Sequence, residues 1–199
     1  MAKLYFKYGA MGSSKTAQAL ITKFNYEERG MKVWIGKPSI DTRDGENIIK
    51  SRIGLSAEAH IIKEHDNLYK LFYNMKEKYD VIIIDEAQFL DEEQVNQLGD
   101  IVIQLKIPVM CFGLKTDFQT KMFPGSKRLF EIAESINEIK TICKCGRKAT
   151  VNARIDSEGN VTTKGAQVEL GGNDRYIAMC YKCFSNIVRK KHILDIIEE

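Results

Sequence analysis

The sequence has little excess charge and no long apolar run, and both absences exclude classes of protein. Its 199 residues carry 30 Lys and Arg against 27 Asp and Glu, so the net charge is only +3. We therefore expect neither nucleic acid nor a membrane as a partner. The longest apolar run, residues 81–84, ends at Asp85 and falls far short of the roughly 20 residues that span a bilayer. The first residues, MAKLYFKYG, lack the apolar core of a signal peptide, so we expect a cytoplasmic protein.

Cysteine is also scarce, and its placement is informative. Four of the five cysteines form two close pairs, with one residue between the first pair and two between the second. In a reducing compartment such pairs favour a metal over disulfides, and four thiolates suit tetrahedral Zn²⁺. We therefore expect a structural zinc site at Cys143, Cys145, Cys180 and Cys183. Separate buried thiols and a redox pair are the alternatives. The fifth cysteine, Cys111, follows an apolar pattern and is expected in the core.

The first two thirds of the chain alternate short apolar runs with longer amphipathic stretches, which is typical of an α/β protein with a parallel sheet. We expect strands at 4–8, 33–36, 60–63, 81–85 and 109–113. Helices are expected at 16–29, 66–78, 91–106 and 126–133, with Asp66 and Asp91 as N-caps. Residues 38–52 show no clear period, so a mobile loop is expected there.

The character of the chain changes after residue 138, where short β-like runs at 140–143 and 149–155 replace the βα alternation. We therefore place a boundary between a domain of residues 1–138 and a domain of residues 139–199. Between the two cysteine pairs lies a glycine-containing segment, residues 159–176. A long segment braced at both ends by one metal can close over a small ligand, and a plain surface hairpin is the alternative.

A phosphate-binding motif lies at residues 9–16, GAMGSSKT, between the first expected strand and the helix that follows it. This is the context of a P-loop, which meets triphosphate charge with backbone N–H groups and the positive end of a helix dipole. Lys15 is expected at the terminal phosphates and Thr16 at Mg²⁺. Ser14 stands where the pattern has its second glycine, and its Cβ bears on nucleotide affinity more than on fold. The alternative is a Gly/Ser-rich turn that binds nothing.

An acidic pair, Asp85 and Glu86, ends the apolar run at 81–84. The carboxyl end of this strand is expected at the ligand crevice, with the strand itself beside the P-loop strand. Asp85 is then placed to hold Mg²⁺ through water, and Glu86 to act as a general base toward a phosphoryl acceptor. A simple strand-end cap is the alternative.

Several motifs occur together along essentially the whole chain. They are GAMGSSKT, DTR at 41–43, DEAQF at 85–89, GLKTDFQ at 113–119, VELGGNDRY at 168–176 and the four paired cysteines. In this order they resemble the type II thymidine kinases, the family of human cytosolic thymidine kinase and its bacterial counterparts. The resemblance implies a RecA-like P-loop parallel sheet domain with a small C-terminal zinc-binding domain that carries a lasso loop. It also implies transfer of the ATP γ-phosphate to the 5′-hydroxyl of thymidine or deoxyuridine, a homotetramer, and dTTP as feedback inhibitor.

The resemblance further implies roles for individual residues. Glu86 is the counterpart of the catalytic base, and Asp85 is the adjacent carboxylate on the magnesium side. The implied ATP and Mg²⁺ site comprises Gly9, Ala10, Met11, Gly12, Ser13, Ser14, Lys15, Thr16, Asp41, Arg43, Asp85 and Gln88. The implied thymidine site comprises Met11, Phe89, Leu114, Phe118, Phe123, Val168, Glu169, Leu170, Gly171, Gly172 and Tyr176. Phe118 is the candidate for stacking on the base, and the backbone of residues 168–172 is the candidate for hydrogen bonds to its edge.

Two other functions compete with this interpretation. DEAQ resembles the acidic box of helicase-type ATPases, although such motors normally need two RecA-like lobes and the βα region here supplies one. The second competing function is that of a zinc-ribbon binding module with an inactive P-loop. Such a module would bind nucleic acid with an affinity that falls steeply with salt concentration.

Overall fold

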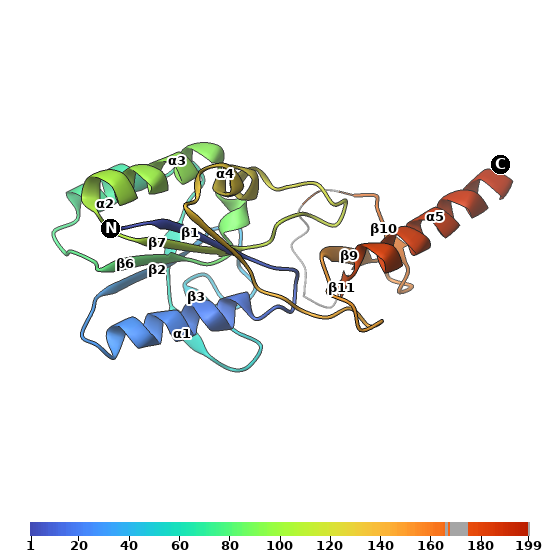
Figure 1. Cartoon of the computed structure of the whole chain (residues 1–199), viewed down its shortest axis with the longest axis horizontal. Helices are drawn as coiled ribbons and strands as arrows, with labels where there is room; N and C mark the ends of the chain where they lie inside the picture. Colours follow the sequence, from blue (N-terminus) through green and yellow to red (C-terminus); the bar gives the residue numbers. More distant parts are fainter. Residues whose placement is uncertain (166, 168–174, 199) are drawn as a thin grey trace.

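A six-stranded sheet forms the centre of the molecule, in the order β5-β2-β6-β7-β1-β8 (Figure 1). The computed structural model describes residues 1–165, 167 and 175–198. The strands are β1 (Leu4–Tyr8), β2 (Val33–Pro38), β5 (His60–Ile62), β6 (Val81–Ile84), β7 (Val109–Gly113) and β8 (Ser135–Glu138). Neighbouring strands are parallel throughout this sheet, which confirms the expected α/β fold.

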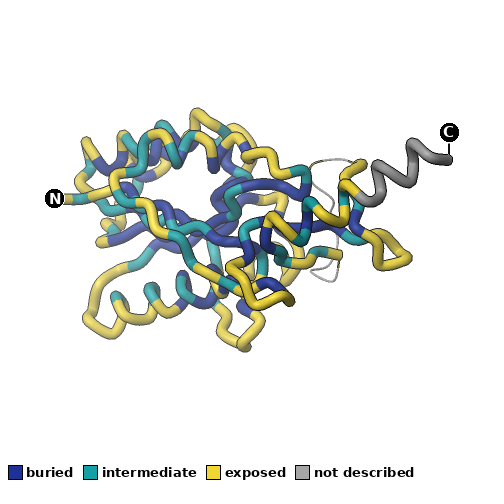
Figure 2. Tube along the Cα trace, turned by 45° about the vertical axis from the view of Figure 1, so that its right-hand side comes forward, coloured by how far each residue is buried: buried dark blue, intermediate teal, exposed yellow. Residues whose placement is uncertain are grey.

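Helices cover both faces of the sheet (Figure 1). Helix α1 (Lys15–Glu27) lies on one face, and α2 (Leu68–Asn74), α3 (Glu92–Asp100) and α4 (Pro124–Ile132) lie on the other. Strand β6 shows why this layering follows from the sequence: Ile82 and Ile84 enter the core beneath α2, α3 and α4, whereas Val81 and Ile83 enter the core beneath α1. A strand buried on both faces is apolar at every position, and the buried residues accordingly run along the central strands (Figure 2).

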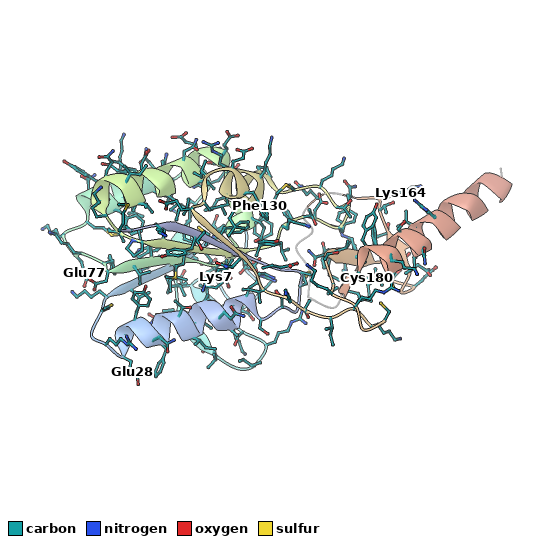
Figure 3. The ribbon with its side chains drawn as sticks, in the orientation of Figure 1. Lys7, Glu28, Glu77, Phe130, Lys164 and Cys180 are labelled. Carbon is teal, nitrogen blue, oxygen red and sulfur yellow. The ribbon has the colours of Figure 1, made fainter. Side chains whose placement is uncertain are left out.

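The packing against the sheet confirms one expectation and corrects another. Cys111 is fully buried among apolar side chains, and burial raises the pKa of its thiol. On the same face Phe130, which is labelled in Figure 3, packs edge-on against Phe6, and the two ring centroids are 5.2 Å apart. However, β6 is not adjacent to β1, because β7 pairs with both and lies between them. The acidic strand end is therefore two strands away from the P-loop strand.

Local structure departs from the expected elements at the ends of two helices. Helix α2 is capped by Asn67, whose side chain accepts from the Lys70 N–H, whereas the Asp66 carboxylate accepts from the Lys63 N–H. Helix α3 begins as expected after Asp91 with a reciprocal capping box and continues past its end as a short π-helix, Ile101–Leu105.

The expected mobile loop at 38–52 contains a strand instead. Strand β3 (Ile48–Lys50) pairs in antiparallel fashion with β4 (Ser56–Glu58) to form a hairpin. Ile49 is buried in the same cluster as Leu20 of α1, and this burial holds the hairpin against the helix. A single apolar side chain in a three-residue strand has no recognisable period, which is why the sequence pattern did not reveal it.

After β8 the chain leaves the large sheet. Strands β9 (Val151–Ile155), β10 (Val161–Thr162) and β11 (Tyr176–Met179) form a small antiparallel sheet in the order β10-β9-β11, followed by α5 (Tyr181–Glu198). Its core contains Val151, Ala153, Val161 and Phe184. The expected β run at 149–155 is confirmed in β9, whereas residues 140–143 form no strand and contribute only a bridge between Ile142 and Lys148.

Candidate active site

The loop at residues 9–14 joins β1 to α1 and requires small residues and unusual backbone angles. A Cβ on Gly9 would lie 2.3 Å from the carbonyl oxygen of Ile139 and 2.4 Å from Ser13 Oγ, so only glycine fits there. Gly12 has a φ of +73°, in the left-handed region that glycine enters without strain. These two glycines are therefore explained by close packing and by backbone conformation.

Ser14 shares that left-handed conformation, with φ 63° and ψ 27°. Its side chain is exposed and makes no capping hydrogen bond to α1, so no contact of that kind offsets the strained backbone. The glycine of the P-loop pattern is thus replaced at a position where the backbone still adopts the angles that glycine favours. Serine in place of glycine at position 14 therefore costs conformational energy, and the backbone there still adopts the left-handed angles.

Lys15 lies inside this loop. Its Nζ donates to the carbonyl oxygens of Gly9 and Ala10, at 3.1 and 3.0 Å. Burial lowers the pKa of Lys15, an effect that the nearby Glu86 and Asp85 carboxylates oppose. The ammonium group is therefore held at the base of the loop with little contact with water.

Thr16, in the first turn of α1, is a neighbour of Asp85 at the end of β6. Burial raises the pKa of Asp85 to about 7, with a further contribution from the Glu86 charge, and the Thr16 hydroxyl opposes this rise. Within the described part of the chain, Asp85 Oδ1 is buried without a hydrogen-bond partner. A buried, partnerless carboxylate oxygen beside a hydroxyl is a suitable donor set for a hard divalent cation such as Mg²⁺.

Glu86 occupies a strained and buried position next to Asp85. Its φ of 51° is in the left-handed region, and its carboxylate is held by Arg43 Nη2 and by Gln88 Nε2, each at 2.5 Å. Burial alone would raise the pKa of Glu86, but the charges of Arg43 and Lys15 and the hydrogen bonds from Gln88 and Arg43 outweigh it and hold the pKa below its usual value. Backbone strain of this kind clusters at functional sites.

The DTR segment joins this network. Arg43 Nε lies 2.6 Å from Asp41 Oδ1, so the guanidinium bridges the carboxylates of Asp41 and Glu86. The completely buried Lys37 donates to the carbonyl oxygen of Gly45 at 2.9 Å and lies 3.6 Å from Asp41 Oδ2. Lys37 was not identified from the sequence, because nothing in the sequence around a lysine in a strand indicates that its side chain is buried.

Lys15, Arg43 and Glu86 face one cleft of about 120 Å³. Its lining combines the P-loop, Glu86 of the acidic pair, the DTR region and the β3–β4 hairpin. The lining residues are Met11, Gly12, Ser14, Lys15, Thr16, Ala17, Arg43, Asp44, Lys50, Ser51, Arg52, Ile53, Glu86 and Leu114. The structure therefore brings together the two halves of the expected phosphate site, although β7 separates their strands.

The residues expected around the thymine base fall into three groups. Met11 and Leu114 line the cleft, and the Leu114 N–H donates to Gln88 Oε1 at 3.0 Å. Phe89 and Phe123 pack edge-on, with centroids 5.6 Å apart. Phe118 is buried beneath the guanidinium of Arg154, which lies 3.7 Å from the ring centroid.

Arg154 connects Phe118 to the last expected contact residue. Its Nε and Nη2 donate to the Tyr176 hydroxyl at 3.1 and 2.9 Å. Val168, Glu169, Leu170, Gly171 and Gly172 lie outside the described residues. Just before them in the chain, the Thr163 carbonyl accepts from Gln119 Nε2 and Gln167 Nε2 donates to Asp117 Oδ2, each at 2.9 Å. The N-terminal flank of the lasso segment is thus fastened to the loop that carries Phe118.

Asn152 on β9 links the small sheet to the P-loop, and the sequence gave no sign of it. Its Oδ1 accepts from the Met11 N–H at 2.7 Å, and its Nδ2 donates to the carbonyl oxygen of Thr116 at 3.1 Å. The residue is almost completely buried, and neither bond is local in sequence. Only the packing of the small sheet against the large one reveals this contact.

The four paired cysteines converge on one point. The sulfur atoms of Cys143, Cys145, Cys180 and Cys183 all lie within 4.8 Å of one another, because the chain before β9 and the chain after β11 adjoin the same end of the small sheet. Cys180 precedes α5, as Figure 3 shows. Tetrahedral Zn²⁺ with bonds of about 2.3 Å needs sulfur atoms about 3.8 Å apart. The cluster therefore fits a Zn(Cys)₄ site after small adjustments.

The parallel sheet, the loop before α1 and the acidic end of β6 define a P-loop-like α/β protein. A model of the thymidine kinase family matches residues 2–184. A thymidine kinase of Legionella pneumophila is 49% identical over 183 residues, which is 90% of this chain and 88% of that protein. Thymidine kinases of Agrobacterium fabrum and Vibrio vulnificus are 48% and 46% identical, covering 90% and 96% of this chain and 94% and 100% of theirs.

The chain therefore belongs to the thymidine kinase family, which confirms the resemblance seen in the motifs and makes the protein a kinase. These relatives give no support to a helicase-type ATPase. In the described part of the chain, no helix is both long enough and apolar enough to cross a membrane.

Proposed function

We propose that the protein transfers the γ-phosphate of ATP to the 5′-hydroxyl of thymidine, giving dTMP, and that deoxyuridine is a second acceptor. One observation carries the proposal: Lys15 of the P-loop and Glu86 of the acidic pair line the same cleft, in a member of the thymidine kinase family. Phosphoryl transfer is catalysed mainly by positioning and by electrostatic stabilisation, and this cleft supplies both.

The triphosphate is proposed to lie on residues 9–16, with the backbone N–H groups and the N-terminus of α1 directed at its charge. Lys15 would exchange its two carbonyl partners for phosphate oxygens. Thr16 and Asp85 are the proposed Mg²⁺ residues, because Asp85 Oδ1 is buried without a partner among the described residues. When bound, Mg²⁺ would offset charge on the phosphates.

Glu86 is proposed to accept the proton of the 5′-hydroxyl. The Arg43 ion pair keeps Glu86 ionised, but it also makes the carboxylate a weaker base. A phosphate that draws the Arg43 guanidinium toward itself weakens this ion pair and raises the basicity of Glu86. Asp41 and Lys37 hold the DTR loop in place for that exchange.

The thymidine site is proposed to comprise Met11, Phe89, Leu114, Phe118 and Phe123, with Tyr176 and the backbone of residues 168–172 on the lasso side. Support comes from the two glutamine contacts that fasten the N-terminal flank of the lasso beside Phe118. Because Arg154 covers one face of Phe118, the base would stack on that ring only from the opposite face or after Arg154 moves.

Residues 139–199 are proposed as a separate zinc-binding domain, with Zn²⁺ held by the four converging cysteines. Support comes from its own antiparallel sheet and from its small core, which is too limited to stabilise a domain alone. The family resemblance supports three further proposals, namely a homotetramer, feedback inhibition by dTTP and a location in the cytoplasm.

The proposed function is tested by measuring ADP release with ATP, Mg²⁺ and each nucleoside in turn. We expect release only with thymidine and deoxyuridine, and none with purine nucleosides or with deoxycytidine. Release that is equal with and without nucleoside, or that RNA or DNA stimulates, would contradict the proposal and point to an ATPase.

A further inference from the structure

The β3–β4 hairpin ends in a well-ordered turn, residues 51–55, that faces the P-loop. The Ser51 N–H donates to the Leu55 carbonyl at 2.8 Å, the Leu55 N–H donates to Ser51 Oγ at 3.0 Å, and the Gly54 N–H donates to the Ser51 carbonyl at 3.0 Å. Gly54 has a φ of +93°, which the turn requires. Because buried Ile49 anchors the hairpin against α1, the turn has a defined position at the cleft.

Arg52 extends from this turn toward the phosphate loop. Its Nη1 lies 3.9 Å from the point where a Cβ on Gly12 would stand. Arg52 lines the same cleft as Lys15, and its charge, together with that of Arg43, adds to the effect of burial in lowering the pKa of Lys15. The guanidinium is therefore close enough to act on any group that the loop holds.

The charges around the cleft do not balance. Its lining contains four cationic side chains, Lys15, Arg43, Lys50 and Arg52, and two anionic ones, Asp44 and Glu86. Arg43 is engaged by Asp41 and Glu86, whereas no carboxylate in the described part of the chain lies within ion-pair distance of Arg52. An exposed guanidinium held over a P-loop without a protein carboxylate is suited to an anionic ligand.

We propose that Arg52 is a phosphate-binding residue that contacts the phosphates of a nucleoside triphosphate held by the P-loop. This role rests on the proposed function, because it requires a triphosphate in the cleft. The planar guanidinium donates two parallel hydrogen bonds to phosphate oxygens, which a lysine at the same place cannot match. Binding would also immobilise the hairpin turn over the nucleotide and restrict the access of water to the phosphates.

The test is calorimetric titration of the zinc-loaded protein with the non-hydrolysable ATP analogue AMP-PNP and Mg²⁺, and separately with thymidine. We compare wild type with Arg52→Gln, and with Arg29→Gln as a control that removes the same charge at an exposed site near the end of α1. Arg52→Gln is expected to weaken AMP-PNP binding about tenfold or more, as loss of a charge-assisted contact does. Arg29→Gln is expected to change it less than about twofold, and thymidine binding is expected to stay the same in both variants.

Each outcome decides a different point. Arg52→Gln with AMP-PNP affinity equal to wild type overturns the role of Arg52 and leaves the proposed function standing. An equal loss of thymidine and AMP-PNP affinity also overturns it, because the substitution would then have disturbed the cleft as a whole. A wild-type protein that binds thymidine but no AMP-PNP overturns the proposed function together with the role of Arg52.

Discussion

The guanidinium of Arg43 lies 2.5 Å from the carboxylate of Glu86, although 43 residues separate them in the sequence. The same guanidinium is 2.6 Å from Asp41, so it bridges the DTR segment and the acidic end of β6. These carboxylates raise the pKa of Arg43, and Arg43 in turn holds the pKa of Glu86 below its usual value. The proposed base is therefore kept ionised and oriented by a cation that a phosphate can draw away.

Replacing Glu86 by Gln tests its role as the base. The amide keeps the size of the side chain but cannot accept the proton, so kcat is expected to fall by roughly 10²- to 10⁴-fold. Thymidine affinity, measured by calorimetry, is expected to stay within about twofold of wild type, because Glu86 is not proposed to hold the base. Glu92→Gln, at an exposed position in the first turn of α3, is the control. A Glu86→Gln enzyme with near-normal kcat would remove Glu86 from this role.

Replacing Ser14 by Gly tests the strain in the loop. Ser14 has a φ of 63°, so glycine removes backbone strain there but adds conformational entropy to the unfolded chain. We expect the net effect to raise the free energy of unfolding by about 0.5–1 kcal/mol. Ser56→Gly in the exposed strand β4, where φ is negative, is expected to lower it instead. Chemical denaturation measures both. A Ser14→Gly variant that is less stable than wild type would show that the serine stabilises this conformation.

Replacing Cys145 by Ser tests the zinc site. We expect one Zn²⁺ per wild-type chain by atomic emission, and a marked loss of metal together with a lower Tm in the variant. Cys111→Ala is the matched control, because Cys111 is buried in the large sheet away from the cluster and should leave the metal content unchanged. Full zinc content in Cys145→Ser would exclude a site with four cysteine ligands.

Replacing Asn152 by Ala tests the link between the small sheet and the P-loop. The substitution leaves the Met11 N–H and the Thr116 carbonyl without their partner, and leaving buried groups unpaired is expected to cost about 1–3 kcal/mol of unfolding free energy. Asn74→Ala, exposed at the end of α2, is expected to change it by less than about 0.5 kcal/mol. Equal stability of the two variants would show that the Asn152 contacts contribute nothing.

Much of the fold was predictable because its signals are local. The apolar strand β6 and the N-cap at Asp91 each depend on residues close in sequence, and both were found where the pattern placed them. The GAMGSSKT motif likewise predicted a loop between a strand and a helix, and the loop is there. Convergence of the cysteine pairs was also predictable, since short spacing favours shared coordination.

The features of the fold and of the site that were not predicted depend on contacts between distant parts of the chain. Nothing near Asn152 or Arg154 indicates that they reach Met11 and Phe118, because these contacts form only when the small sheet packs beside the first part of the chain. The position of β7 between β1 and β6 was missed for a related reason, since sequence order does not determine the order of parallel strands. The β3–β4 hairpin, with Arg52 at its turn, was hidden in a polar segment that one buried isoleucine holds in place.

The measurement that tests the central claim most directly follows the transferred phosphate itself. The protein is incubated with Mg²⁺, thymidine and ATP labelled with ³²P in the γ-phosphate, and the products are separated by chromatography. The account predicts that the label appears in dTMP in step with ADP formation, and that Glu86→Gln nearly abolishes this transfer. Label released as inorganic phosphate at the same rate with and without thymidine would contradict it.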